Sequence, residues 1–310
     1  MTTPILRIGT RGSPMALAQA NQVRNLLAAR YEELTQPGAL ETVVVKTTGD
    51  MILDRTLADI GGKELFTKEI EEALYRNEID LAMHSLKDMP TFLPPNLMIA
   101  CVLERDDPRD AWLSPSGQSL ADLAPGAIVG TASLRRQSQI LHVRPDLRVE
   151  PIRGNAGTRM TKLSEGNYSA TLLAISGLRR LNLEKVVTQI LDYDDFLPAV
   201  AQGAIAVECR EADEKTRAYL APLNHAESQQ RVDMERAFLA VVNGSCRTPI
   251  AGLAEIIGDD EMWFRGLVAR PDGTEIWRVE RRCTIHEALG VGKDAGEELK
   301  AQIDLDVLQL

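Results

Sequence analysis

The chain has 310 residues, of which 44% are hydrophobic and 26% charged, a composition typical of globular proteins. Its 35 basic and 45 acidic residues give a formal net charge of −10, which argues against nucleic acid as a partner. The four cysteines form no C-x-x-C pair, so the sequence predicts neither a zinc cluster nor a disulfide framework, and it favours a reducing, cytoplasmic setting. No apolar run is long enough for a membrane span, and the N-terminus does not resemble a secretory signal.

The N-terminal third alternates between predicted strands and helices. A strand at 6–10 is followed by Ser13, which can cap a helix, and by Pro14, which suits the first helical position. Apolar residues then recur at helical spacing. Further elements are expected as strands at 42–48, 80–85 and 97–103 and as a helix at about 66–74. This alternation is typical of α/β folds with parallel strands.

The alternation continues after Glu104 and gives way to a different pattern near the C-terminus. Strands are predicted at 127–130, 149–152, 170–175 and 204–208, with helices starting after the first two. A helix at 227–242 precedes three strands at 251–257, 262–269 and 275–283, which tight turns separate, and a last helix begins at about 286. The sequence therefore predicts two α/β units and a third, α+β domain.

Positively charged residues gather at the predicted starts of helices. The N-terminal end of a helix carries about +0.5 of an elementary charge, so a cation there is unfavourable by about 0.3–1 kcal/mol. A single such arginine could simply reach solvent or a surface carboxylate. Several of them, all at turns rich in Gly, Ser and Thr, indicate a bound anion. The group comprises Arg11, Lys63, Arg135, Arg136, Arg153 and Arg159.

Two further segments contain residues that could do chemistry. Lys87 and Asp88 follow the strand predicted at 80–85, where a carboxylate could transfer protons or stabilise a positive intermediate, or simply form a loop turn. Cys246 follows the helix predicted at 227–242 in a Gly/Ser loop. It could be a nucleophile, an attachment point or a buried small hydrophobe. The four histidines show no recognisable pairing with it.

A series of motifs runs in order through nearly the whole chain. They are LRIGTRGSPMALAQA, GDMILD, GGKELFTKEIE, HSLKDMP, ERDDPRDA, GTASLRRQ, RGNAGTR, LPAVAQGA and NGSCRTPI. Together they resemble the porphobilinogen deaminase (hydroxymethylbilane synthase) family. One departure is Asp59, where members often carry a lysine.

This resemblance implies a transferase of tetrapyrrole (haem and porphyrin) biosynthesis. The family joins four porphobilinogen molecules head to tail with release of ammonia, and hydrolysis frees the linear hydroxymethylbilane. A dipyrromethane cofactor, held by a thioether to a loop cysteine, primes elongation and stays bound. Each pyrrole carries an acetate and a propionate, which would explain why an acidic protein gathers arginines. The resemblance also suggests a monomer.

The family's functional positions can be carried over residue by residue. Its catalytic aspartate falls on Asp88, its attachment cysteine on Cys246 and its inter-domain hinge segment on Gln202. Cofactor-binding positions fall on Ser85, Lys87, Thr131, Ser133, Arg135 and Arg136. Substrate-binding positions fall on Arg11, Ser13, Lys63, Phe66, Arg153, Arg159 and Arg180. No metal is implied.

The implied fold has two α/β domains of the type II periplasmic-binding-protein kind and a smaller C-terminal α+β domain. Their expected boundaries are 1–103 with 200–221, 104–199 and 222–310. Two hinge crossings would let the domains shift as the chain of rings lengthens. A binding module that closes on a carboxylate ligand would share these domains but would need neither Asp88 nor Cys246. A cysteine-nucleophile hydrolase or transferase would need a histidine paired with Cys246.

Overall fold

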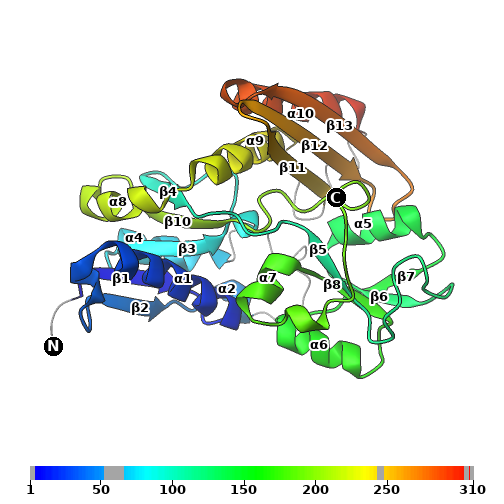
Figure 1. Cartoon of the computed structure of the whole chain (residues 1–310), viewed down its shortest axis with the longest axis horizontal. Coiled ribbons are helices and arrows are strands. Elements are labelled where there is room, and N and C mark those ends of the chain that lie inside the picture. The colour runs from blue at the N-terminus through cyan, green and yellow to red at the C-terminus, as the bar shows by residue number, and fades with distance from the viewer. Residues whose placement is uncertain (1–3, 52–65, 243–247, 304–306, 308–310) are drawn as a thin grey trace. The chain divides into compact units, whose positions relative to one another are not determined.

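The computed structural model describes residues 4–51, 66–242, 248–303 and 307. The chain divides into two compact units, and it passes between them more than once (Figure 1). The first unit contains Met1–Asp106 and Ala204–Gln229, and the second contains Asp107–Gly203 and Gln230–Leu310. No helix within the described ranges combines the length and the apolar character that a bilayer crossing requires.

The first unit is built on a five-stranded sheet with the order β2-β1-β3-β10-β4. Its strands are β1 (Leu6–Thr10), β2 (Leu40–Val44), β3 (Leu81–Ser85), β4 (Leu97–Val102) and β10 (Ile205–Arg210). Its helices are α1 (Pro14–Arg30), α2 (Thr48–Met51), α4 (Lys68–Tyr75) and α8 (Glu214–Leu220), with 3-10 turns η1 (Glu32–Thr35), η3 (Leu86–Asp88) and η5 (Ala221–Leu223). Apolar residues of α1 and of α4 pack into two separate clusters with sheet residues.

Local sequence signals account for much of this unit. Ser13 caps α1 as predicted, because its Oγ accepts a hydrogen bond from the Ala16 N–H at 3.2 Å, and Pro14 opens the helix. The strand predicted at 42–48 is wrong at both ends. β2 begins and ends earlier, since Thr48 starts the helical turn α2.

The second unit contains a five-stranded sheet with the order β7-β6-β8-β5-β9. Its strands are β5 (Asp110–Leu113), β6 (Ile128–Gly130), β7 (Arg148–Glu150), β8 (Ala170–Ala174) and β9 (Gln189–Ile190). The associated helices are α5 (Leu134–Val143), α6 (Ala156–Ser164) and α7 (Ile175–Arg180), with the 3-10 turn η4 (Glu184–Val186).

The two five-stranded sheets share one pattern of strand directions. In each, three parallel strands are followed by one antiparallel strand, β10 or β5, and by a last strand antiparallel to that one. The expectation of parallel strands is therefore wrong for β10, and the antiparallel strand β5 was not predicted. Each begins just after the chain has passed from one unit to the other, so no crossover helix within the sheet imposes a parallel direction.

A smaller antiparallel sheet completes the second unit. Its strands are β11 (Ile250–Ile257), β12 (Glu261–Ala269) and β13 (Ile276–Thr284), joined by turns with Gly258 and Gly273 at positive φ. The neighbouring helical elements are α9 (Ala226–Val242), which begins in the first unit, the 3-10 turn η6 (Ile285–Glu287) and α10 (Ala288–Gln302). A Cβ at Gly292 would lie 2.6 Å from the Met234 carbonyl oxygen, so this glycine lets α10 approach α9 closely. The predicted fold class, two α/β sheets and a smaller α+β part, is confirmed.

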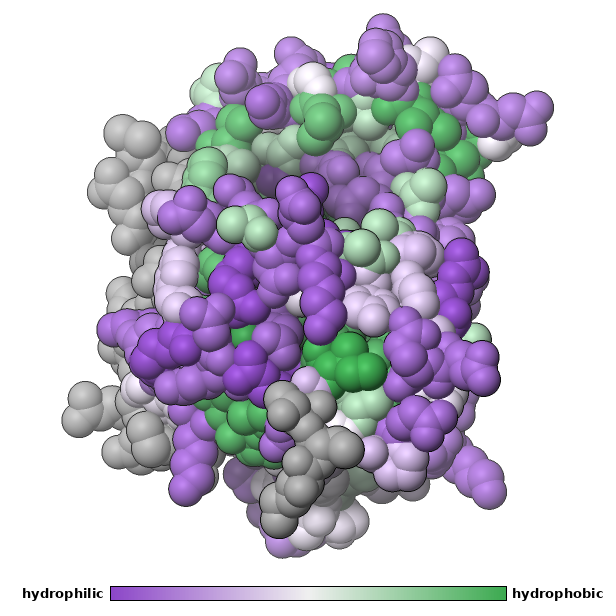
Figure 2. All heavy atoms as spheres, turned by 90° about the vertical axis from the view of Figure 1, so that its left-hand side faces the viewer, coloured by the Kyte–Doolittle hydropathy of each residue, from purple (hydrophilic) through white to green (hydrophobic). Residues whose placement is uncertain are grey.

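The core and the surface divide as the composition predicts. The largest fully buried side chains include Trp112, Phe196, Phe238 and Phe264, all in the second unit. On the face drawn in Figure 2, hydrophilic residues predominate and hydrophobic residues form only small areas.

Candidate active site

Asp88 is presented by a turn whose neighbours are anchored in the core of the first unit. The buried strand β3 leads into η3, where the Leu86 N–H donates to the Ala204 carbonyl at 3.0 Å. Leu86 and Met89 are both buried, and the Met89 N–H closes the turn on the Leu86 carbonyl. Asp88 is exposed between them. The carboxylate is therefore held by the backbone while it stays accessible to a ligand.

Predicted binding residues flank this strand. Ser85, the last residue of β3, accepts a hydrogen bond from the buried Gln19 Nε2 of α1 at 2.9 Å. The Arg11 guanidinium lies over the Phe66 ring, 4.2 Å from its centroid, which is a cation–π contact. The structure therefore brings these two predicted residues together. Two others, Lys63 and Cys246, lie outside the described residues, as does Asp59.

In the second unit, Ser133 caps α5 and places two arginines in its first turn. The Ser133 Oγ accepts the Arg136 N–H at 3.4 Å, and the Thr131 Oγ1 accepts the Ser133 N–H at 3.1 Å. The first turn contains no acidic residue, so Arg135 and Arg136 stand where the helix dipole disfavours cations, as predicted.

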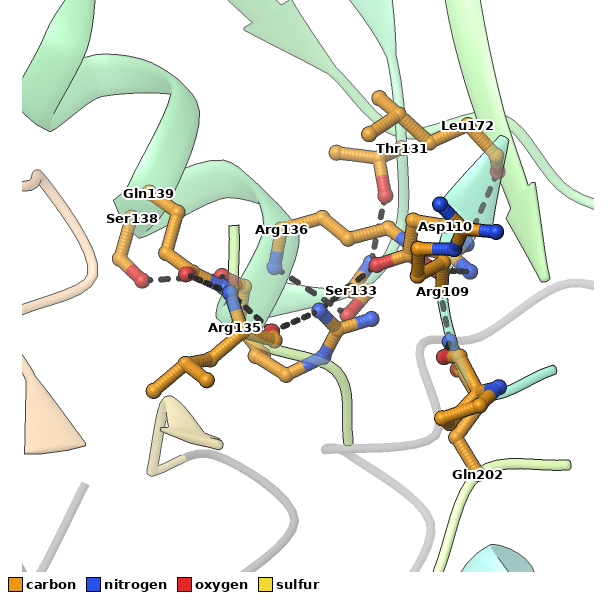
Figure 3. A network of polar contacts seen from close by, with 12 residues as sticks. Arg109, Asp110, Thr131, Ser133, Arg135, Arg136, Ser138, Gln139, Leu172 and Gln202 are labelled. Carbon is orange, nitrogen blue, oxygen red and sulfur yellow. Dashed lines mark hydrogen bonds and ion pairs between the residues drawn. The ribbon is translucent and has the colours of Figure 1, made fainter. Parts of the chain in front are cut away.

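A buried carboxylate that sequence reasoning missed lies between these arginines (Figure 3). Asp110 is fully buried at the start of β5, with Oδ2 2.8 Å from Arg135 Nη1 and Oδ1 2.7 Å from Arg136 Nη2. Arg135 Nη1 also donates to the Leu197 carbonyl, and Arg136 Nη1 donates to the Leu172 carbonyl, each at 2.8 Å. The anion expected at the start of α5 is thus, in part, supplied by the protein itself.

Burial and the attraction between opposite charges shift the pKa values of Asp110 and Arg135. Burial by itself raises the pKa of Asp110, but the charges and hydrogen bonds of Arg135 and Arg136 outweigh burial and hold that pKa well below its usual range. Burial lowers the pKa of Arg135, against the attraction of Asp110. Two guanidiniums share one carboxylate, so the group retains one surplus positive charge.

Arg153 and Arg159 add to this surplus. α6 is capped by Asn155, whose side chain accepts the Thr158 N–H, and Arg159 follows in its first turn. Partial burial and the positive charges of Arg136 and Arg153 together lower the pKa of Arg159 to about 10. The arginines therefore lie close enough to repel one another, which favours a bound anion.

The predicted hinge residue joins the same network. Gln202 is fully buried, and its Nε2 donates to the Pro108 carbonyl at 2.7 Å and to Asp110 Oδ1 at 2.9 Å. Nearby in sequence, the Gly203 carbonyl accepts a hydrogen bond from Arg180 Nη2 at 2.6 Å. Two predicted residues thus hold the segment that leads into the first unit.

These residues suit a ligand with several carboxylates. Guanidiniums and hydroxyls are the donors that bind carboxylates, and Arg135 and Arg136 share the Asp110 carboxylate. A dipyrromethane group with acetate and propionate side chains therefore fits the residues of α5 and α6. Within the described ranges, no group of three His, Cys, Asp or Glu side chains could hold a metal ion.

Comparison with known proteins agrees with this chemistry. Residues 6–218 match the family model described as porphobilinogen deaminase, dipyromethane cofactor binding domain, and residues 229–301 match porphobilinogen deaminase, C-terminal domain. The chloroplastic porphobilinogen deaminase of Pisum sativum is 56% identical over 96% of this chain and 81% of its own. The porphobilinogen deaminase of Nitrobacter winogradskyi is 50% identical over 96% of this chain and 94% of its own.

Solved structures give a more distant likeness. A periplasmic binding protein of an ABC transporter from Brucella ovis, with glutathione bound, is 13% identical, with a TM-score of 0.39, over 76% of this chain and 68% of that chain. The two family models together cover most of the sequence, and relatives align over nearly its full length. The chain therefore belongs to the porphobilinogen deaminase family.

Proposed function

We propose that Asp88 is the catalytic carboxylate of this chain and that arginines of both units bind the carboxylates of the substrate and cofactor. The observation that carries the proposal is the concentration of arginines around α5 and α6. Arg135 and Arg136 share the Asp110 carboxylate, and burial together with the charges of Arg136 and Arg153 lowers the pKa of Arg159. A polyanionic ligand suits such a concentration of positive charge.

The chain is an enzyme of tetrapyrrole biosynthesis, and its reaction is the hydroxymethylbilane synthase reaction, with porphobilinogen as the family's substrate. Loss of ammonia from porphobilinogen leaves an electron-poor methylene-pyrrolenine, which is positively charged when its ring nitrogen is protonated. The exposed Asp88 carboxylate stabilises that charge and accepts or returns a proton as the next ring attacks. The buried neighbours of Asp88 keep the carboxylate in place during these steps.

Binding of the cofactor and of the substrate is divided between two sets of residues. Thr131, Ser133, Arg135 and Arg136, with Ser85 and Lys87, hold the carboxylates of the cofactor. When bound, dipyrromethane supplies the terminal pyrrole that primes elongation. Cys246 is the proposed thioether attachment. The substrate carboxylates are bound by Arg11, Ser13, Lys63, Arg153, Arg159 and Arg180, with Phe66 packed against the rings. Stacking on Phe66 already orients the Arg11 guanidinium.

Intact-mass measurement tests the proposed attachment of the cofactor to Cys246. We expect the purified chain to be heavier than its sequence mass by a two-pyrrole unit and Cys246→Ser to lack that increment. An unmodified chain with full activity would overturn the covalent attachment. A binding module would also lack the increment, and it would release no ammonia from porphobilinogen.

The domain boundaries, the cellular compartment and the oligomeric state are further proposals. We propose domain boundaries at 1–103 with 200–221, 104–199 and 222–310, with Gln202 in the hinge. We also propose that the enzyme is a cytoplasmic monomer. Two of its cysteines, Cys101 and Cys209, are buried free thiols, which suits a reducing compartment. Sedimentation at micromolar concentration tests the monomer, and a mass of two chains would contradict it.

A further inference from the structure

We infer that Asp110 is the positioning residue of the arginine pair that binds the cofactor carboxylates, and that it ties this pair to both segments where the chain passes between units. The inference rests on the proposed function of Arg135 and Arg136. Among the described residues, Asp110 contacts both arginines and the predicted hinge residue Gln202.

Asp110 fixes the orientation of each guanidinium. One carboxylate oxygen contacts Arg135 and the other contacts Arg136, while backbone carbonyls of Leu197 and Leu172 hold the same two side chains from other directions. The Arg136 guanidinium is held at three nitrogens, because Nε and Nη2 donate to Asp110 and Nη1 donates to Leu172, and three points fix the plane of a rigid group. Arg135 makes both of its contacts through Nη1, which fixes the position of that nitrogen. Each guanidinium has five N–H donors, so donors remain for a ligand carboxylate.

Asp110 also determines the net charge of the group that it forms with Arg135 and Arg136. Two adjacent buried guanidiniums repel each other, and neither is more than 6% exposed, so water screens them poorly. One shared carboxylate offsets that repulsion and leaves one positive charge for a ligand. With an uncharged residue at position 110, the two guanidiniums would repel each other and would be held by the backbone carbonyls without a carboxylate between them.

A third contact links Asp110 to the two segments at which the chain passes between the units. Gln202 Nε2 bridges Asp110 Oδ1 and the Pro108 carbonyl. Pro108 follows the first passage between units, and Gln202 precedes the return passage. A shift of either segment would therefore act on the carboxylate that orients the arginines.

A double-mutant cycle tests the inference. Asp110→Asn, Arg135→Gln and the double variant are purified, and intact mass gives the fraction of chains that carry the two-pyrrole increment. KM and kcat for porphobilinogen are then measured on the loaded fraction. We expect Asp110→Asn to lower the loaded fraction or raise KM by about tenfold or more. In the Arg135→Gln background, the same change should have a clearly smaller effect, because only Arg136 still depends on Asp110. Independent effects that simply multiply would overturn the inference.

Two further variants keep the test decisive. Asp110→Glu retains the charge but moves it by one methylene group. We therefore expect the fraction of chains that carry the cofactor to lie between that of the wild type and that of Asp110→Asn. If Asp110→Asn fails to fold, a well-folded Asp110→Glu with wild-type loading and KM would overturn the inference. Asp146→Asn is the matched control, because Asp146 pairs with Arg144 at the surface of the same unit. Its loading and KM should not change.

The arginine variants separate this inference from the proposed function. Normal loading and KM in both Arg135→Gln and Arg136→Gln would overturn the ligand role of the pair, and the inference with it. Impaired arginine variants beside a normal Asp110→Asn would overturn the role of Asp110 alone.

Discussion

The Glu235 carboxylate holds the backbone of Ala201. Its Oε2 accepts the Ala201 N–H at 2.6 Å, and its Oε1 accepts the Ala254 N–H of β11 at 2.9 Å. Glu235 lies on α9 and is fully buried. A single side chain thus links the segment beside Gln202 to the C-terminal sheet.

Replacing Glu235 should therefore destabilise the second unit. Glu235→Ala leaves two buried N–H groups without this acceptor, and we expect a loss of about 2–5 kcal/mol in the free energy of unfolding. Glu235→Gln keeps one acceptor oxygen but turns an NH₂ group toward the other N–H, so it should fall between the wild type and Glu235→Ala. Urea denaturation measures both. Wild-type stability in Glu235→Ala would show that these contacts contribute nothing.

Ala201 itself should tolerate glycine. Its φ of 59° lies in the left-handed region, which costs a residue with a Cβ about 1 kcal/mol and costs glycine almost nothing. We expect Ala201→Gly to unfold at the same or slightly higher urea concentration than the wild type. Ala204→Gly, just beyond the passage between units, is the control that should destabilise. A clear loss of stability in Ala201→Gly would contradict the strain argument.

The sequence predicted those elements whose signals are local. The cap of α1 at Ser13 and the turns at Gly258 and Gly273 depend on residues within a few positions, and all three are observed. The direction of β10 could not be predicted in this way, because it depends on where the chain re-enters the first unit. That is a long-range property which no local pattern encodes.

Asp110 was missed for the same reason. The strand β5 has only four residues, all buried, and it lacks the alternation that marks a half-buried strand. One signal was present, since a carboxylate that opens the apolar segment Asp110–Leu113 needs a buried cationic partner. The arginines were found from the helix dipole, but their shared partner is 25 positions away in sequence from Arg135 and is brought there by the sheet.

Asp88→Asn should separate catalysis from folding. Asp88 is exposed, and its turn is anchored by Leu86 and Met89, so the melting temperature should stay close to that of the wild type. Turnover should fall by about 100-fold or more, because the amide neither stabilises a positive intermediate nor accepts a proton. Intact mass should still show the cofactor increment. Near-normal turnover would remove Asp88 from the mechanism.

Arg159→Gln should weaken binding without weakening the fold. Burial lowers the pKa of the Arg159 guanidinium, and repulsion by Arg136 and Arg153 contributes, so that this pKa is about 10. Removing the charge relieves that repulsion, so we expect an unchanged or higher melting temperature together with a raised KM for porphobilinogen. The surface substitution Arg148→Gln is the control and should change neither. A large loss of stability would show that Arg159 serves the fold.

The buried Asp110 carboxylate should make stability depend on acid pH. Its pKa is depressed in the folded chain, whereas an unfolded aspartate has a pKa of about 3.9. The stabilisation is therefore complete above about pH 5 and is lost as the pH falls through 4 toward the depressed folded value, because the unfolded chain binds the proton first. The gap in unfolding free energy between the wild type and Asp110→Asn should shrink by up to about 1.4 kcal/mol per pH unit below pH 3.9. Asp146→Asn, whose ion pair is exposed to solvent, should show a much weaker dependence. Urea unfolding at pH 7 and pH 3 gives the two gaps, and equal gaps would mean that Asp110 is not held as an ion in the folded protein.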